Sequence, residues 1–156
     1  MSVTTLYKKI THSAEETEEC GRETARLLLS DPSLPPFIAL YGDLGVGKTA
    51  FTRGVSSVIA PGAPVRSPTF ALVNEYRAAK ELPFTAVFHF DMYRIESEDD
   101  LDSIGFWDYP ARRGLILTEW SEKIPFALPD DYLRLTIEKT ADVESIRVIT
   151  AERIQS

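Results

Sequence analysis

The hydrophobic positions of this chain fall in short runs separated by polar, glycine-rich or proline-rich segments, and these runs predict a sheet. Phe37–Tyr41 is continuously apolar, which is typical of a parallel strand that is buried on both faces. Near the end of the chain, Tyr132–Thr140 and Ser145–Ile154 alternate apolar and polar residues and predict an antiparallel hairpin. Four further segments are predicted to be strands: Thr4–Ile10, Phe70–Tyr76, Thr85–Phe90 and Gly114–Trp120.

Helices are predicted between these strands. Ser13 and Glu16 form a capping box, which predicts a helix from there to about Leu29. A second predicted helix follows a glycine-rich segment and reaches about Val58, and Glu96–Ile104 predicts a short acidic helix. The order of the elements predicts one α/β domain over all 156 residues, with a mixed sheet at its centre.

The glycine-rich segment after the first buried strand matches the P-loop pattern G-x-x-x-x-G-K-[ST] in full. It reads Gly42-Asp43-Leu44-Gly45-Val46-Gly47-Lys48-Thr49. Its glycines let successive backbone N–H groups turn toward an anion, which the positive end of the following helix also attracts. We therefore expect residues from Gly42 to Ala50 to bind ATP, with Lys48 at the β and γ phosphates and the Thr49 hydroxyl on Mg²⁺. The predicted fold is a P-loop NTPase-like three-layer sandwich whose central sheet is mainly parallel.

Two predicted strands end in carboxylates. Thr85–Phe90 runs into Asp91, and the strand that begins at Gly114 runs into Glu119. Because the carboxyl ends of parallel strands meet at the crevice beside a P-loop, both side chains are expected there. One would hold Mg²⁺, directly or through water, and the other would orient the attacking water or position a switch loop. Taken singly, each is explained equally well as a solvent-exposed acid at a strand end.

The nucleotide is predicted to be ATP, because the N-K-x-D motif that usually selects guanine in P-loop GTPases is missing from the sequence. The net charge of −7 provides no basic surface for gripping RNA, so a nucleic-acid partner is expected to be held mainly by other proteins. The apolar runs are too short to span a bilayer, and the first residues lack the apolar centre of a signal peptide. The single cysteine, Cys20, cannot form an internal disulfide. A cytoplasmic protein without membrane contact is expected.

Several further segments, together with the P-loop, resemble the bacterial TsaE family over roughly Thr11 to Leu135. The family consists of small ATPases needed for threonylcarbamoyl modification of the adenosine beside the anticodon in certain tRNAs. The combination of segments is specific, although the P-loop alone is shared by many proteins. The segments are Ser67-Pro68-Thr69-Phe70, Leu72-Val73-Asn74-Glu75-Tyr76, His89-Phe90-Asp91-Met92-Tyr93-Arg94, Gly105 with Asp108-Tyr109, and Glu119-Trp120.

The resemblance implies roles for residues in the nucleotide site. Glu119 would be the second protein ligand of Mg²⁺ beside Thr49, and Asp91 would act in hydrolysis. Trp120 would lie near the nucleotide, and Thr11 matches a position that contacts the base side. Without the resemblance, Trp120 would be interpreted as a core residue and Thr11 as a strand-end threonine.

The resemblance also implies a switch loop and partners. Ser67 and Thr69 would belong to a loop close to the γ-phosphate, where the residue-based alternative is a turn that merely starts a strand. His89 is interpreted as a hydrogen-bonded structural histidine. The implied partners are TsaD and TsaB, with tRNA bound mainly through them. Because no motif places an arginine finger in the sequence, hydrolysis is expected to be slow until a partner stimulates it.

Two alternatives remain open from the sequence. A small-molecule P-loop kinase often carries an arginine-rich lid, for which Arg112 and Arg113 are the candidates. These arginines are also explained as a surface loop or as a contact to nucleic acid or phosphate. The second alternative is a switch protein that binds ATP and recruits a partner without needing hydrolysis.

Overall fold

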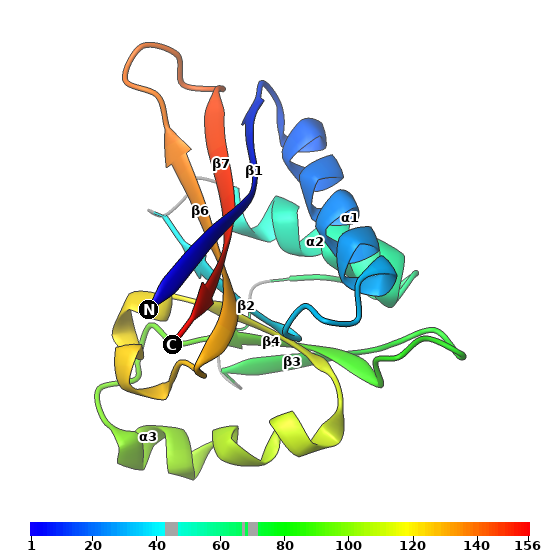
Figure 1. Ribbon diagram of the computed structural model, residues 1–156, viewed down its shortest axis with the longest axis vertical. Helices are drawn as coiled ribbons and strands as arrows, with labels where there is room; N and C mark the ends of the chain where they lie inside the picture. Colours follow the sequence, from blue (N-terminus) through cyan, green and yellow to red (C-terminus); the bar gives the residue numbers. More distant parts are fainter. Residues whose placement is uncertain (43–46, 67, 69–71) are drawn as a thin grey trace.

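The computed structural model describes residues 1–42, 47–66, 68 and 72–156. Within these residues, seven strands form one sheet in the order β1-β7-β6-β2-β5-β4-β3 (Figure 1). The strands are β1 (Ser2–Thr11), β2 (Phe37–Tyr41), β3 (Val73–Arg77), β4 (Ala86–Asp91), β5 (Leu115–Glu119), β6 (Asp131–Lys139) and β7 (Arg147–Gln155). The helices are α1 (Ala14–Ser30), α2 (Lys48–Ile59) and α3 (Glu98–Ser103). Short 3-10 turns are η1 (Phe106–Asp108), η2 (Pro110–Arg112), η3 (Ser121–Lys123) and η4 (Pro125–Ala127).

The sheet is mixed, with a parallel centre, as predicted. Strand β2 pairs in parallel with β5 and β6, and β5 pairs in parallel with β4. Strand β7 runs antiparallel to both β6 and β1, and β3 runs antiparallel to β4. All the described strands except β7 and β3 therefore point in one direction, which confirms the mainly parallel sheet and the antiparallel hairpin of β6 and β7.

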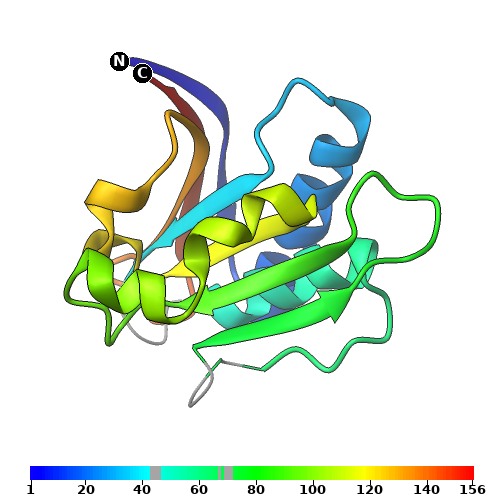
Figure 2. The ribbon, with the colours of Figure 1, turned by 90° about the horizontal axis from the view of Figure 1, so that it is seen from below.

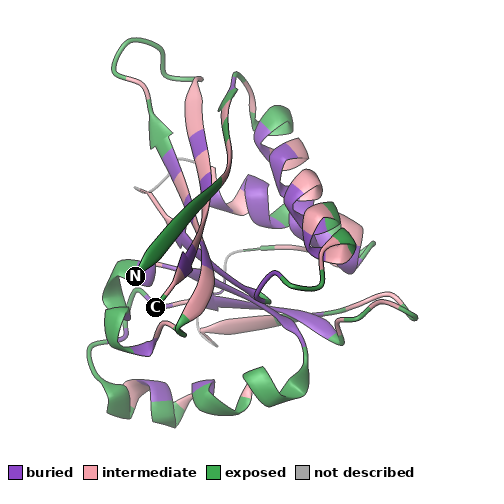
Figure 3. Ribbon diagram, viewed as in Figure 1, coloured by how far each residue is buried: buried purple, intermediate pink, exposed green. Residues whose placement is uncertain are grey.

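Side chains of β2 alternate between the two faces of the sheet, and each face has its own apolar core. Ile38 and Leu40 pack with α1 and α2, whereas Phe37 and Ala39 pack with the face that carries α3 and the 3-10 turns. Figure 2 shows these two groups of helices on opposite sides of the sheet. Figure 3 shows that the central strands are almost wholly buried, while the first half of β1 is exposed. This arrangement is the predicted three-layer sandwich.

Helix α1 begins directly after Ser13, as predicted, although Glu16 reaches back to the N–H of His12 and not to that of Ser13. Ser13 Oγ accepts a hydrogen bond from the Glu16 backbone N–H at 3.1 Å, and Glu16 Oε1 accepts one from the His12 backbone N–H at 3.2 Å. The acidic helix is shorter than predicted and covers Glu98–Ser103. Strand β3 begins at Val73 instead of Phe70, and Phe70 itself lies outside the described residues. In the described part of the chain, no helix combines the length and the apolar character that crossing a bilayer requires.

Candidate functional site

The two predicted carboxylates lie at the same edge of the sheet. Asp91 is the last residue of β4 and Glu119 the last of β5, and the parallel register places them opposite each other. Strand β2, on the other side of β5, ends one residue before Gly42 and is followed by the glycine-rich segment. The topology therefore brings Gly42, the first residue of the glycine-rich segment, to the same edge of the sheet as Asp91 and Glu119.

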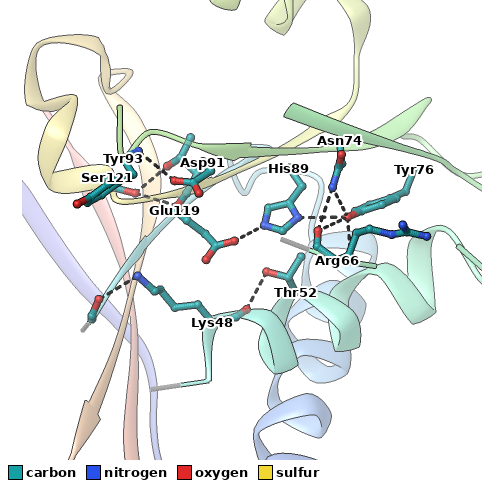
Figure 4. A network of polar contacts seen from close by, with 12 residues as sticks. Lys48, Thr52, Arg66, Asn74, Tyr76, His89, Asp91, Tyr93, Glu119 and Ser121 are labelled. Carbon is teal, nitrogen blue, oxygen red and sulfur yellow. Dashed lines mark hydrogen bonds and ion pairs between the residues drawn. The ribbon is translucent and has the colours of Figure 1, made fainter. Parts of the chain in front are cut away.

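Lys48 is the first residue of α2 and is buried, with 5% of its surface exposed. Its ammonium group donates a hydrogen bond to the carbonyl oxygen of Gly42 at 3.0 Å. The same nitrogen lies 4.7 Å from the centre of the Trp120 ring, a cation–π contact. Trp120 follows Glu119 directly, so this contact brings Lys48 to the end of β5. Figure 4 shows Lys48 together with Asp91 and Glu119.

Gly47 is the residue that precedes α2, and only glycine suits its position. Its φ of +115° lies in the left-handed region that side chains rarely adopt. A Cβ there would also lie 3.3 Å from the methyl group of Thr17 in α1. The Gly47 carbonyl accepts the first helical hydrogen bond of α2, from the Phe51 N–H at 3.0 Å. Both the loop-to-helix turn and its close contact with α1 therefore depend on this glycine.

Thr11 lies at the end of β1 and is 3% exposed. Its hydroxyl is 2.9 Å from the hydroxyl of Thr17, whose methyl group faces Gly47. Thr11 is therefore linked to Gly47 of the glycine-rich segment through Thr17 of α1. Thr17 was not predicted as a neighbour of the site, because a threonine in a helix carries no local signal for such a contact. The role of Thr11 at the base side stays a prediction.

Asp91 is half-buried, and this burial raises the pKa of its carboxyl group. The nearby negative charge of Glu119 raises that pKa further, whereas Lys48 and a hydrogen bond from the Tyr93 backbone N–H, at 2.9 Å to Oδ1, lower it. The backbone N–H of Asp91 donates to the Leu72 carbonyl at 2.9 Å. Asp91 is therefore a fixed carboxyl group with an affinity for protons above that of an exposed aspartate.

Glu119 is 7% exposed and is held by a buried histidine. Its Oε2 atom is hydrogen-bonded to Nε2 of His89, and Nδ1 of His89 lies 3.3 Å from the hydroxyl of Tyr76 (Figure 4). His89 is the hydrogen-bonded strand histidine that the sequence predicts. Its two partners were not predicted, because they come from different strands and meet only in the folded sheet.

The remaining predicted site residues fall into two groups. Thr49 and Ala50 lie in the first turn of α2, where Thr49 is half-buried and Ala50 buried. The others lie outside the described residues: Asp43, Leu44, Gly45, Val46, Ser67 and Thr69.

The oxygen atoms of Thr49 and Glu119 are donors of the kind that Mg²⁺ takes, namely a hydroxyl and a carboxylate. Among the described residues, no group of three or more His, Cys, Asp or Glu side chains is arranged to hold a metal ion by itself.

Arg112 lies at the opposite edge of the sheet, before the start of β5. Its guanidinium group donates two hydrogen bonds to the carboxylate of Glu75, at 2.8 and 2.9 Å, and holds the pKa of that carboxyl below its usual range. It also lies 4.6 Å above the centre of the Phe88 ring. Arg112 is thus engaged in pairing at the end of β5 away from Glu119, which argues against the lid of a P-loop kinase.

The mixed sheet, the helices on both faces and the loop-to-helix turn at Lys48 define an α/β protein of the P-loop NTPase-like class. The chain belongs to the TsaE family, because the model of that family, described as threonylcarbamoyl adenosine biosynthesis protein TsaE, matches residues 11–148.

Similar proteins agree with this membership. A relative named tRNA threonylcarbamoyladenosine biosynthesis protein TsaE, from Haemophilus influenzae, is 35% identical over 130 residues, 83% of this chain and 80% of its own length. A relative of the same name from Bacillus subtilis is 34% identical over 141 residues, 90% of this chain and 83% of its own. The crystal structure of YdiB from Bacillus subtilis superposes with a TM-score of 0.73 at 29% identity, covering 99% of this chain and 88% of that one.

Proposed function

We propose that this protein is a Mg²⁺-dependent ATPase of the machinery that makes threonylcarbamoyladenosine in tRNA. The observation that carries the proposal is the meeting of Lys48, Asp91 and Glu119 at one edge of the sheet, beside a complete P-loop sequence. Membership of the TsaE family, and the names of the Haemophilus and Bacillus relatives, support the pathway.

Lys48 would bind the β and γ phosphates of ATP. Its ammonium group is already directed to this edge by the Gly42 carbonyl and the Trp120 ring. Phosphate oxygens are stronger partners for an ammonium group than a neutral carbonyl, since both partners are then charged. Lys48 would therefore exchange its bond to Gly42 for bonds to the nucleotide, while the aromatic face of Trp120 stays beside it.

Thr49 and Glu119 would hold the metal ion, through one hydroxyl and one carboxylate oxygen. Mg²⁺, when bound there, would supply the positive charge that offsets the negative charge developing during phosphoryl transfer. His89 engages Oε2 of Glu119, so we assign Oε1 to the metal.

Asp91 would orient the attacking water and accept its proton. Its carboxyl group lies opposite Glu119 in the register, and its raised pKa brings it closer to the range in which a general base works well. The Tyr93 backbone N–H holds Oδ1, which fixes the direction of the carboxylate.

ATP hydrolysis by this chain would act on partner proteins. A net charge of −7 gives this chain little attraction for the phosphates of RNA, so tRNA would be bound mainly by TsaD and TsaB-like proteins. The protein would act in the cytoplasm, where tRNA is modified.

The residues at Ser67 and Thr69 would respond to the γ-phosphate as a switch loop, of the kind that nucleotide state orders in GTPases.

The proposal predicts that ATP hydrolysis is slow for the protein alone and rises when TsaD and TsaB are added. The physical reason is that no arginine of this chain is placed by a motif to neutralise the transition state, so a partner must complete the site. The measurement is the release of labelled phosphate from γ-labelled ATP, with and without the purified partners.

Two results would contradict this prediction. Transfer of the label to a nucleoside or metabolite instead of water would indicate a kinase. An unchanged rate with partners present, together with ATP-dependent assembly of the complex, would indicate a non-enzymatic switch. An Asp91→Ala variant that still binds nucleotide separates the cases, because a switch would keep its ATP-dependent assembly and an ATPase would lose turnover.

A further inference from the structure

Three neighbouring strands each contribute one buried side chain to a line of hydrogen bonds that begins at Glu119. Glu119 lies on β5, His89 on β4 and Tyr76 on β3, and they are 7%, 0% and 5% exposed. Nε2 of His89 contacts Glu119 Oε2, and Nδ1 of His89 lies 3.3 Å from the Tyr76 hydroxyl. Buried polar groups in such a line are costly unless each has a partner, so their geometry is strongly constrained.

We propose that His89 and Tyr76 are positioning residues that fix Glu119 for its metal and couple it to the backbone of Arg66. This inference rests on the proposed function, in which Glu119 is a ligand of Mg²⁺. Neither residue touches the nucleotide or the metal; both act through Glu119.

The chemistry of the Glu119 carboxylate sets the first donor of this line. An ionised carboxylate only accepts hydrogen bonds, so Nε2 of His89 carries the hydrogen that is donated to Glu119. The Tyr76 hydroxyl has one hydrogen, which it can donate either to Nδ1 of His89, at 3.3 Å, or to the Arg66 carbonyl, at 3.1 Å. A histidine that donates to a ligating carboxylate fixes the direction of that carboxylate, as partners of metal ligands commonly do.

The line ends at the peptide groups of Arg66. The Arg66 N–H donates to the Tyr76 hydroxyl at 3.3 Å, and the Arg66 carbonyl lies 3.1 Å from the same hydroxyl. The side-chain amide of Asn74 donates to that carbonyl at 2.9 Å and to the Tyr76 hydroxyl at 3.3 Å. Figure 4 shows Tyr76, Asn74 and Arg66 gathered at one end of this line and Glu119 at the other.

Arg66 directly precedes Ser67, and the described residue after 71, Leu72, is also tied to the site. The Leu72 carbonyl accepts the backbone N–H of Asp91 at 2.9 Å. The chain on either side of residues 67–71 is therefore attached to β4, at His89 through Tyr76 and at Asp91 directly. A shift of Glu119 toward a metal ion changes the position of His89, and Tyr76 carries that change to Arg66.

The first test measures how turnover depends on the Mg²⁺ concentration. His89→Ala is expected to raise the Mg²⁺ concentration that gives half the maximal rate by about tenfold or more, the usual effect of removing the partner of a metal ligand. His89→Gln keeps an N–H near the position of Nε2 and is expected to recover most of this loss. Nucleotide binding in EDTA should be the same in both variants and in the wild type.

The second test follows hydrogen–deuterium exchange of the backbone in residues 61–66, with a non-hydrolysable ATP analogue in Mg²⁺ or in EDTA. The wild type is expected to show slower exchange in Mg²⁺, and Tyr76→Phe is expected to lose this difference. Tyr7→Phe is the matched control, because it removes a hydroxyl that bonds Thr24 at 2.7 Å and that belongs to β1, which is at the opposite end of the strand order from β3. It should lower stability but keep the Mg²⁺-dependent difference.

The outcomes separate this inference from the proposed function. One outcome overturns the inference alone. In it, the wild type hydrolyses ATP only with Mg²⁺, Tyr76→Phe keeps the exchange difference, and His89→Ala needs the same Mg²⁺ concentration as the wild type. The coupling is then absent, and the two side chains are structural. If the wild type shows no response to Mg²⁺ in either assay, both the proposed function and the inference are overturned.

Discussion

Replacing Lys48 with alanine is expected to lower the rate of Mg·ATP hydrolysis by at least about a hundredfold, the usual cost of losing one charge-stabilising donor. The side chain is buried at the start of α2, and its ammonium group reaches the edge that carries Asp91 and Glu119. Among the lysines that the structure describes, Lys48 alone begins a helix. Phosphate release and nucleotide binding are the measurements.

Two further variants make the Lys48 result interpretable. Lys48→Met keeps most of the apolar stem against Trp120 and should fold as the wild type does, while losing turnover as the alanine variant does. Lys9→Ala removes a lysine on β1 that pairs with Glu23 of α1, and it should leave turnover unchanged. Wild-type turnover in both Lys48 variants would show that the P-loop sequence does not act on nucleotide here.

The second large effect is expected at Gly54, where α2 crosses α1. A Cβ at this position would lie 1.9 Å from the Glu18 carbonyl oxygen and 3.0 Å from the Arg22 nitrogen, both backbone atoms of α1. Gly21 of α1 approaches α2 in the same way, with 2.1 Å from its built Cβ to the Phe51 oxygen. The two helices therefore touch backbone to backbone, and a methyl group must push them apart.

Gly54→Ala is expected to lower the free energy of unfolding by about 3 kcal/mol, at the upper end of the usual cost of overpacking. In a helix without this contact, alanine would instead be favoured by about 1 kcal/mol. Ser57→Ala, on the exposed side of the same helix, exchanges a hydrogen bond to the Gly54 carbonyl at 2.7 Å for the higher helix propensity of alanine, so it should change the free energy by no more than about 0.5 kcal/mol. Urea unfolding measures all three proteins, and equal midpoints for Gly54→Ala and the wild type would contradict the packing described.

The parts of the fold that the sequence predicts well are those with a strong local pattern. The predicted strand Phe37–Tyr41 has the bounds of β2, because a continuous apolar run between prolines and glycines leaves little room for another interpretation. The capping box at Ser13 and Glu16 fixes the start of α1 for the same reason. The position of Asp91 and Glu119 at one edge of the sheet was predictable because each lies at the end of a buried strand.

The parts that were not predicted depend on contacts between distant segments. Strand β1 pairs with β7, which joins the two ends of the chain, and neither segment carries a signal for the other. The link from Glu119 to Tyr76 through His89 needs the order of β5, β4 and β3 in the sheet. Arg112 is a second example. The sequence allows it to belong to the lid of a kinase, and only its pairing with Glu75 in the folded protein identifies it as a structural arginine.

The central claim is that the edge of the sheet at Lys48 and Glu119 binds Mg·ATP. Calorimetric titration of ATP into the wild-type protein and into Glu119→Ala, each with Mg²⁺ and with EDTA, tests it most directly. We expect saturable binding of one ATP per chain in the wild type, tighter with Mg²⁺ than with EDTA, and no such gain from Mg²⁺ in Glu119→Ala. An absence of binding in the wild type, or an equal gain from Mg²⁺ in both proteins, would contradict it.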